Sequence, residues 1–206
     1  MMQRKKMEDN LAYEKAQLEK GCVYIAGVDE VGRGPLAGPV TVCAIVMPLN
    51  EEDIIAEVTD SKKLSAKKRE KLCPLIEEKA LACKVVSLPP EYIDKVNILN
   101  ATKEAMRLAL AGLKIRPDVA LIDAVNIESG CPVVPIIKGD LLSYSIACAS
   151  IVAKVTRDKY MDDQALLYPQ YGFEKNKGYG TKTHIDAIRE YGITPLHRRT
   201  FVTHFI

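Results

Sequence analysis

Four carboxylates stand where apolar segments of the chain end, and acids in such places can do metal-dependent chemistry. Asp29 and Glu30 close the apolar run at 22–29, Asp123 follows the letters VALI, and Asp140 follows IIKG. Because a buried, unpaired carboxylate is costly, such groups need a partner. Acids gathered at strand ends form a hard-oxygen cage that suits Mg²⁺ or Mn²⁺. No histidine lies near them in the sequence, which argues against zinc.

Each of these acids also has an ordinary interpretation. Any one could cap a turn or a helix, and Asp140 could be the N-cap of the helix that follows it. Asp29 and Glu30 pose a further difficulty, because adjacent strand residues point to opposite faces. Both reach one metal site only if the strand bends, or if one side chain approaches from the edge. The four acids taken together favour a shared site.

A glycine-rich loop follows the first acids. Gly32, Gly34 and Gly38 lie in G-R-G-P-L-A-G, which is not the G-x-G-x-x-G pattern of dinucleotide binding. One interpretation is a hairpin turn that needs positive φ angles. The other is a loop whose backbone approaches a ligand while Arg33 stays near an anion. The two interpretations are compatible.

Apolar runs and helical periodicity predict the elements that position these residues. Short β-branched runs predict strands at 22–29, 40–47, 82–88, 119–123 and 133–137. Helices are expected at 7–20 (exposed, with little core face), 66–80 (broken or kinked by Pro74), 97–113, 141–161 and 181–191. A hairpin followed by alternating strands and helices predicts one mixed α/β sheet of five strands flanked by helices.

Composition excludes several protein classes. The chain has 206 residues, 48% of them hydrophobic and 27% charged, which is too apolar for a disordered protein. No apolar stretch could span a bilayer and the charged N-terminus is not a secretory signal, so we expect a cytoplasmic protein with no membrane partner. The six cysteines form no C-x-x-C pair and are expected to be small buried hydrophobes in a reducing compartment.

A net charge of +2 neither requires nor excludes a polyanionic partner, but the charges are unevenly distributed. Residues 51–60 carry five acids and no base, whereas 61–71 carry six bases and one acid. Residues 175–199 carry six bases against two acids. The near-neutral total is therefore a cancellation between acidic stretches and basic segments suited to phosphates.

The segment AGVDEVGRGPLAGPV closely resembles the opening signature of ribonuclease HII, the type 2 ribonuclease H, in its bacterial form. Other segments are similar to motifs of the same family and occur in its order between residues 22 and 201: DSKKLS, NILNATKEAM, LIDAVN, KGD, ASIVAKVTRD, NKGYGTKTH and HRRTF. The resemblance implies a ribonuclease H-like catalytic domain at 21–206, preceded by a short helical extension at 1–20.

The resemblance places the family's catalytic and metal-binding carboxylates on Asp29, Glu30, Asp123 and Asp140. It implies an endonuclease that uses Mg²⁺ or Mn²⁺ to hydrolyse RNA paired with DNA and to cut duplex DNA 5′ to a single embedded ribonucleotide. In such a displacement one metal activates water and the other stabilises the leaving 3′ oxygen. The expected products carry a 3′-hydroxyl and a 5′-phosphate.

The resemblance also implies how substrate is recognised. The backbone of Gly32, Arg33 and Gly34 would contact the ribose 2′-hydroxyl, the group that tells RNA from DNA. Tyr179 would stack on the adjacent deoxyribose; taken alone, it could be a half-buried aromatic beside a glycine turn. Further residues lie in motifs that the family uses near the substrate backbone: Ser61, Lys62, Asn97, Asn100 and Thr102.

Some of these residues have structural alternatives. Asn97 could be an N-cap, Thr102 a helix-surface residue and Lys62 a solvated lysine. Arg157 and Asp158 could form a structural ion pair. Lys138 and Lys177 are candidate phosphate contacts, whereas Lys154 lies with Arg157 and Asp158 in the helix predicted over ASIVAKVTRD. We assign no catalytic role to His184 or His197.

The chain departs from the family pattern in two ways. Asn176 stands where many relatives have histidine, which could alter a local hydrogen bond. The sequence ends soon after HRRTF, where some relatives continue into a helical segment that holds nucleic acid, so we expect a weaker grip on duplexes. We expect a monomer, and the end VTHFI shows no sliding-clamp motif. Two alternatives are a non-catalytic nucleic-acid-binding module on the same fold and a metal-dependent phosphatase for small molecules.

Overall fold

The five predicted strands form one mixed sheet, and their order in it is β3-β2-β1-β4-β5. The computed structural model describes residues 10–58 and 64–206. β1 pairs antiparallel with β2, which pairs antiparallel with β3, whereas β1–β4 and β4–β5 are parallel. The strands are β1 (Ile25–Val31), β2 (Val40–Val46), β3 (Ala82–Leu88), β4 (Val119–Asp123) and β5 (Val133–Ile136).

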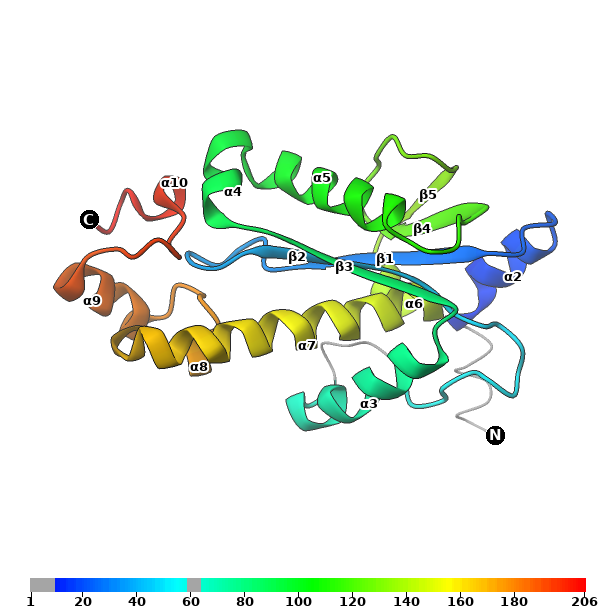
Figure 1. Ribbon diagram of the computed structural model, residues 1–206, viewed down its shortest axis with the longest axis horizontal. Coiled ribbons are helices and arrows are strands. Elements are labelled where there is room, and N and C mark those ends of the chain that lie inside the picture. Colours follow the sequence, from blue (N-terminus) through cyan, green and yellow to red (C-terminus); the bar gives the residue numbers. More distant parts are fainter. Residues whose placement is uncertain (1–9, 59–63) are drawn as a thin grey trace.

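Helices cover both faces of this sheet (Figure 1). Helices α4 and α5 lie on one face, and the long helix α7 with α3 lies on the other. The helices are α2 (Ala12–Leu18), α3 (Ala66–Lys79), α4 (Pro90–Val96), α5 (Ile98–Ala111), α6 (Gly139–Leu142), α7 (Tyr144–Leu167), α8 (Phe173–Asn176), α9 (Lys182–Tyr191) and α10 (Arg199–Val202), with a 3-10 turn at Pro169–Tyr171.

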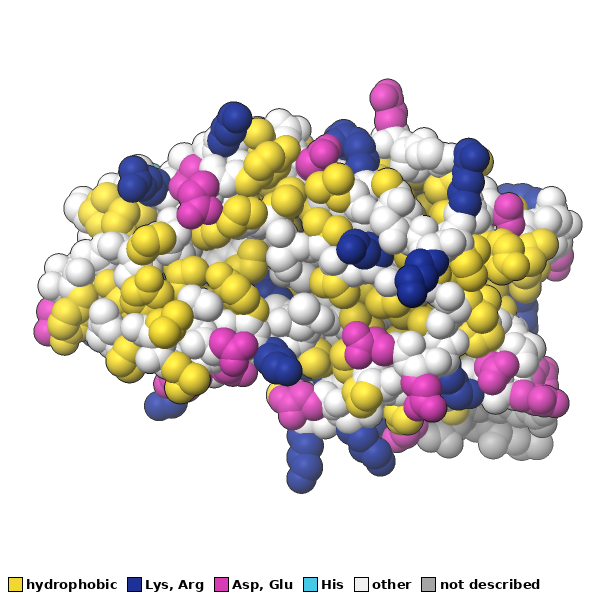
Figure 2. Space-filling model, viewed as in Figure 1, with side chains coloured by type: hydrophobic (Ala, Val, Ile, Leu, Met, Phe, Trp, Pro, Cys, Tyr) yellow, Lys and Arg dark blue, Asp and Glu magenta, His cyan; other side chains and the backbone are white. Residues whose placement is uncertain are grey.

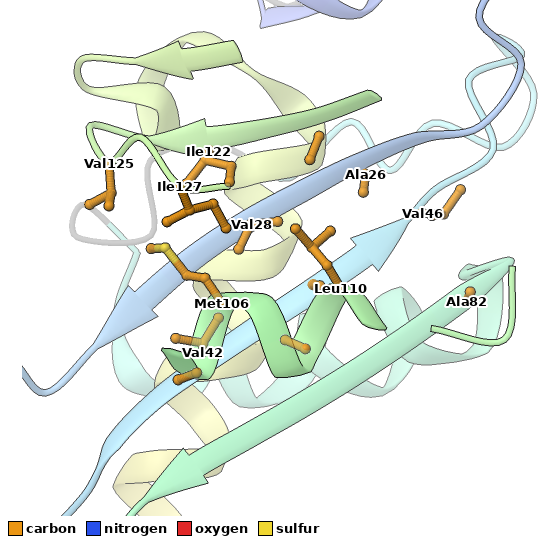
Figure 3. Close-up of a cluster of buried hydrophobic side chains, with 14 residues drawn as sticks. Ala26, Val28, Val42, Val46, Ala82, Met106, Leu110, Ile122, Val125 and Ile127 are labelled. Carbon is orange, nitrogen blue, oxygen red and sulfur yellow. The ribbon is translucent and has the colours of Figure 1, made fainter. Parts of the chain in front are cut away.

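Each face of the sheet packs its own core. Under α5, Met106 and Leu110 lie against strand residues such as Val28 and Ile122 (Figure 3). On the other face, small residues of α7 allow that helix to pack closely on β1. A Cβ on Gly27 would lie 2.1 Å from the carbonyl carbon of Ser145, so only glycine fits there. The same helix therefore holds the strand that carries Asp29.

Several predicted elements needed correction. Strand β1 begins at Ile25 and continues to Val31, so Asp29 and Glu30 lie within it rather than at its end. Helix α3 is continuous through Pro74, because its buried Leu72, Cys73 and Ile76 pack against the α7 side of the sheet.

The helix predicted at 97–113 is confirmed as α5, which spans Ile98–Ala111 and follows its N-cap Asn97 at φ 66°. Helix α4, directly before Asn97, was not predicted. Helix α7 extends to Leu167, beyond the predicted end at 161. Short helices α8 and α10 were not predicted.

The sequence predicts an exposed N-terminal helix, but α2 packs against the rest of the protein. Glu14 is fully buried and Gln17 nearly so. One carboxylate oxygen of Glu14 accepts hydrogen bonds from the Ser143 hydroxyl and, at 2.9 Å, from the Ser145 amide. These are groups at the start of α7, where amides lack helical partners. Helix α2 is therefore fastened to the end of α7 nearest α6.

The cysteines form no disulfide in the described residues. Cys43, Cys73 and Cys148 are buried as predicted, whereas Cys22, Cys83 and Cys131 are only partly buried. Within residues 10–58 and 64–206, no helix has the length and apolar character needed to span a bilayer. Lys and Arg side chains are interspersed with Asp and Glu over the face shown in Figure 2, in keeping with the small net charge.

Candidate active site

One cavity of about 280 Å³ brings together much of the predicted site. Three of the four acids line it, together with the glycine loop and Tyr179, although these residues are up to 150 positions apart. The lining residues are Asp29, Glu30, Val31, Gly32, Arg33, Gly34, Arg69, Asp123, Ser150, Lys154 and Tyr179. The lining thus combines three acids with three cations, the two kinds of charge that a site for a metal-bound anion requires.

The sheet explains how two adjacent strand residues share a cavity. The last pair between β1 and its parallel neighbour β4 is Val28 with Ile122. From Asp29 onward this edge of β1 is therefore open toward the carboxyl end of β4. Side chains leaving either face can reach round an open edge, and Asp123, the last residue of β4, lies beside them.

Electrostatics show that the acids crowd one another. Burial, then the charge of Glu30, raises the pKa of Asp29 well above its usual range, with a smaller contribution from Asp123. Burial also raises the pKa of Glu30, whereas Arg33, whose Nη1 lies 3.2 Å from Glu30 Oε1, opposes that rise. The other oxygen, Oε2 of Glu30, is buried without a hydrogen-bond partner among the described residues.

These features fit divalent cations. All of the converging donors are carboxylate oxygens, which Mg²⁺ and Mn²⁺ prefer. A cation would relieve the mutual repulsion of Asp29 and Glu30 and would satisfy the orphaned oxygen. Across residues 10–58 and 64–206, no three His, Cys, Asp or Glu side chains lie close enough together to hold a metal ion as they stand.

Asp140 is the one predicted acid that is absent from the cavity lining. It is 3% exposed. The adjacent Gly139 amide donates to Asp123 Oδ1 at 2.7 Å, which ties this segment to the end of β4. Asp140 lies inside α6, and the N-cap of α7 is Ser143, so the N-cap interpretation of Asp140 is wrong.

Two buried arginines hold the glycine loop, a role that sequence reasoning missed. Arg198 Nε donates to the Gly38 carbonyl, its Nη1 to Arg33 and its Nη2 to Gly32 and Gly38, at 2.5–3.0 Å. Arg157 donates to the carbonyls of Pro39, Lys177 and Ala37 at 2.9–3.1 Å. Both side chains are fully buried.

Arg157 therefore does not pair with Asp158, which was one sequence-based alternative. Adjacent helix residues point in different directions, and Asp158 instead binds Lys154, one turn earlier, at 2.7 Å. Gly32 adopts φ 89°, and a Cβ there would lie 2.2 Å from Arg157 Nε. The Arg157 side chain can therefore occupy this position only because residue 32 is a glycine.

The remaining predicted contacts are distributed as follows. Ser61 and Lys62 lie outside the described residues. Asn97 is the N-cap of α5 and accepts the Asn100 amide at 3.0 Å, which confirms the capping alternative. Thr102 is fully buried and donates to the Ile98 carbonyl at 2.7 Å, so it is not a helix-surface residue. Asn97, Asn100 and Thr102 do not line the cavity.

Candidate lysines also differ from one another. Lys154 lines the cavity, Lys138 is exposed and Lys177 pairs with Asp162. Arg69, which sequence reasoning did not single out, lines the cavity and donates to the Leu64 carbonyl. Asn176 is buried, donates to the Tyr171 carbonyl and accepts the Gly178 amide at 2.8 Å, so it shapes the turn before Tyr179.

Comparison with known proteins decides the family. The family model described as Ribonuclease HII matches residues 26–204. The chain belongs to the ribonuclease HII family. It is 54% identical over 195 residues to the ribonuclease HII of Acholeplasma laidlawii, covering 94% of both chains. Membership makes the chain an enzyme of the ribonuclease H type.

Solved structures agree with this placement. The ribonuclease H2 of Pyrococcus horikoshii OT3 matches with a TM-score of 0.76 at 27% identity, over 89% of this chain and 97% of that one. Bst-RNase HIII, solved in complex with Mn²⁺, shares the fold with a TM-score of 0.67 at 19% identity, over 87% of this chain and 67% of that one. The mixed sheet and its helices are thus a ribonuclease H-like fold, as the sequence resemblance implies.

Proposed function

We propose that this ribonuclease HII family member is an endonuclease that hydrolyses the RNA strand of RNA–DNA hybrids and cuts duplex DNA on the 5′ side of a single embedded ribonucleotide. One observation carries the proposal: Asp29, Glu30 and Asp123 line the same cavity as the G-R-G loop and Tyr179. Groups that can hold metal thus lie beside groups that can recognise a ribose and its neighbour.

Asp29, Glu30 and Asp123 would hold the divalent ions, with Asp140 drawn in as a fourth ligand. Bound divalent ions supply positive charge that activates water and stabilises the leaving 3′ oxygen. Two observations support this assignment: Oε2 of Glu30 is buried without a hydrogen-bond partner among the described residues, and burial beside Glu30 raises the pKa of Asp29. Mg²⁺ and Mn²⁺ both suit these ligands.

Cations of the chain would orient the substrate phosphates. Lys154 and Arg33 line the cavity while paired with Asp158 and Glu30, respectively. A phosphate entering the cavity can exchange with these carboxylates as the partner of either cation. Because the pairs are only partly buried, that exchange costs little.

The G-R-G loop would read the 2′-hydroxyl, which both donates and accepts hydrogen bonds. The Arg198 guanidinium donates hydrogen bonds to the carbonyls of Gly32 and Arg33, so their peptide planes are fixed before substrate binds. Tyr179 is 43% exposed, which leaves ring surface available for stacking on a deoxyribose.

Cleavage assays test this proposal against the two alternatives. Incubate the protein with an RNA–DNA hybrid, and with duplex DNA containing one ribonucleotide, in Mg²⁺, Mn²⁺ or a chelator. We expect metal-dependent cleavage of both substrates and none after Asp123→Asn, whose melting temperature should be close to that of the parent. Binding without cleavage in either metal would mean a non-catalytic module. Hydrolysis of small phosphate esters alone would mean a phosphatase.

A further inference from the structure

His184 and His197 form a buried pair behind Tyr179. Their exposed fractions are 0% and 2%, and their Nε2 atoms lie 3.1 Å apart. Neither lines the cavity of the acids. A buried pair of imidazoles is stable only if every ring nitrogen has a partner of the right kind.

The backbone groups at the two ends of the pair define where its protons lie. The Thr194 amide donates to His197 Nδ1 at 2.9 Å, so the proton of that ring is on Nε2. His197 Nε2 must then donate to His184 Nε2, which leaves the His184 proton on Nδ1. That nitrogen lies 2.9 Å from the Tyr179 carbonyl and donates to it. One arrangement of protons, with both rings neutral, satisfies the whole chain of bonds.

The rings are also held in orientation. Tyr171 and Phe173 stack on each other with centroids 5.5 Å apart and contact both histidines. The Tyr179 carbonyl additionally accepts the Thr181 amide at 2.8 Å, so both of its lone pairs are used. The peptide that carries the Tyr179 ring is thus fixed from two sides.

We propose that His184 and His197 are positioning residues that hold Tyr179 in the substrate cavity. The residue after His197 is Arg198, which binds the carbonyls of Gly32 and Arg33. Residues 197–198 therefore set the place of Tyr179 relative to the G-R-G loop. This inference rests on the proposed stacking role of Tyr179. It concerns specificity for the ribonucleotide and its neighbour, not the chemical step.

The first test needs neither metal nor substrate. Long-range ¹H–¹⁵N NMR of the histidine side chains at pH 7.5 should show His197 protonated at Nε2 and His184 at Nδ1. The opposite tautomer at either ring, or a charged ring, would overturn the hydrogen-bond chain.

The second test separates positioning from stability by kinetics on a duplex with one ribonucleotide. His184→Leu removes the donor to Tyr179, and we expect KM to rise about ten-fold with kcat changed less than about two-fold. His184→Asn keeps an amide donor near the place of Nδ1 and should recover much of the loss. His204→Asn, at an exposed histidine near the C-terminus, is the matched control.

A double-mutant cycle tests whether the effect of His184 on KM is transmitted through Tyr179. If His184 acts through Tyr179, His184→Leu should add little to the KM of Tyr179→Ala. Additive effects, or a loss of melting temperature with KM unchanged, would overturn the inference. If the parent protein cuts neither substrate, the proposed function fails instead, while the tautomers still test the hydrogen-bond chain. Should His184→Leu not fold, His184→Asn and the NMR experiment retain the test.

Discussion

Asp29 and Glu30 follow one another in strand β1, yet both carboxyls line the same cavity. Successive strand residues leave opposite faces of a sheet. The two side chains converge because pairing with β4 ends at Val28, so the edge of β1 is open beside them. The adjacent acids thus share one cavity because of where the pairing of β1 with β4 ends.

Neutralising Asp29 should separate catalysis from folding. Asp29→Asn removes a charge that burial and Glu30 oppose, while its side-chain oxygen can still accept the Glu30 amide. We expect cleavage to fall by at least roughly a thousand-fold and stability to rise by about 1 kcal/mol. Metal-dependent cleavage and urea unfolding at pH 7 measure the two effects. Retained cleavage, or unfolding of the variant, would contradict this assignment.

Tyr179 should matter most where RNA meets DNA. Tyr179→Ala removes the stacking ring and should impair cutting at a single ribonucleotide more than cutting of a long hybrid, by about ten-fold. Tyr179→Phe keeps the ring and is the control. KM and kcat on the two substrates give the comparison. An equal loss on both would count against stacking on a deoxyribose.

Arg198 should stabilise both the fold and the loop. Its guanidinium makes four hydrogen bonds to the carbonyls of Gly32, Arg33 and Gly38, a geometry that an ammonium cannot reproduce. Arg198→Lys should lower the free energy of unfolding by about 2–4 kcal/mol. Arg107→Lys, in an exposed pair with Glu104, should change it by less than about 0.5 kcal/mol. Similar values for the two variants would refute the scaffold role.

Part of this architecture could be predicted because its causes are local. Strands β3 and β4 occupy the predicted residues, since each is a short apolar run bounded by turns or prolines. The three acids of the cavity were recognisable as polar interruptions of apolar segments.

Long-range contacts explain what was missed. Helix α4 was not predicted; it begins at Pro90, a position where a missing amide costs nothing. The partners of Arg157 and Arg198 are backbone carbonyls more than 100 residues away, apart from Lys177, and carbonyls leave no mark in a sequence. Burial of Glu14 depends on amides of α7 for the same reason.

Acid should weaken the fold through the histidine pair. Burial, then repulsion from His184, lowers the pKa of His197 to about 4, and burial lowers that of His184. Unfolded histidines bind protons below about pH 6.5, so the free energy of unfolding should fall as pH drops from 6.5 toward 4.

Buried acids such as Asp29 act in the opposite sense, because their raised pKa favours proton binding by the folded state. The contribution of the histidines is therefore the difference between the parent and the His184→Asn/His197→Asn variant, followed by urea unfolding between pH 7 and 4. We expect the parent to lose more stability, by about 3 kcal/mol at pH 4. Parallel profiles would show that the pair is not buried in neutral form.

The most direct test of the whole account is the position and chemistry of the nick in duplex DNA that contains one ribonucleotide. End-labelled strands on a sequencing gel, with enzymatic tests of the new ends, resolve both. The account predicts a nick on the 5′ side of the ribonucleotide, a 3′-hydroxyl and a 5′-phosphate, and no product in chelator. A nick on the 3′ side with a 2′,3′-cyclic phosphate would contradict it, because the 2′-hydroxyl would then be the attacking group rather than the recognised one.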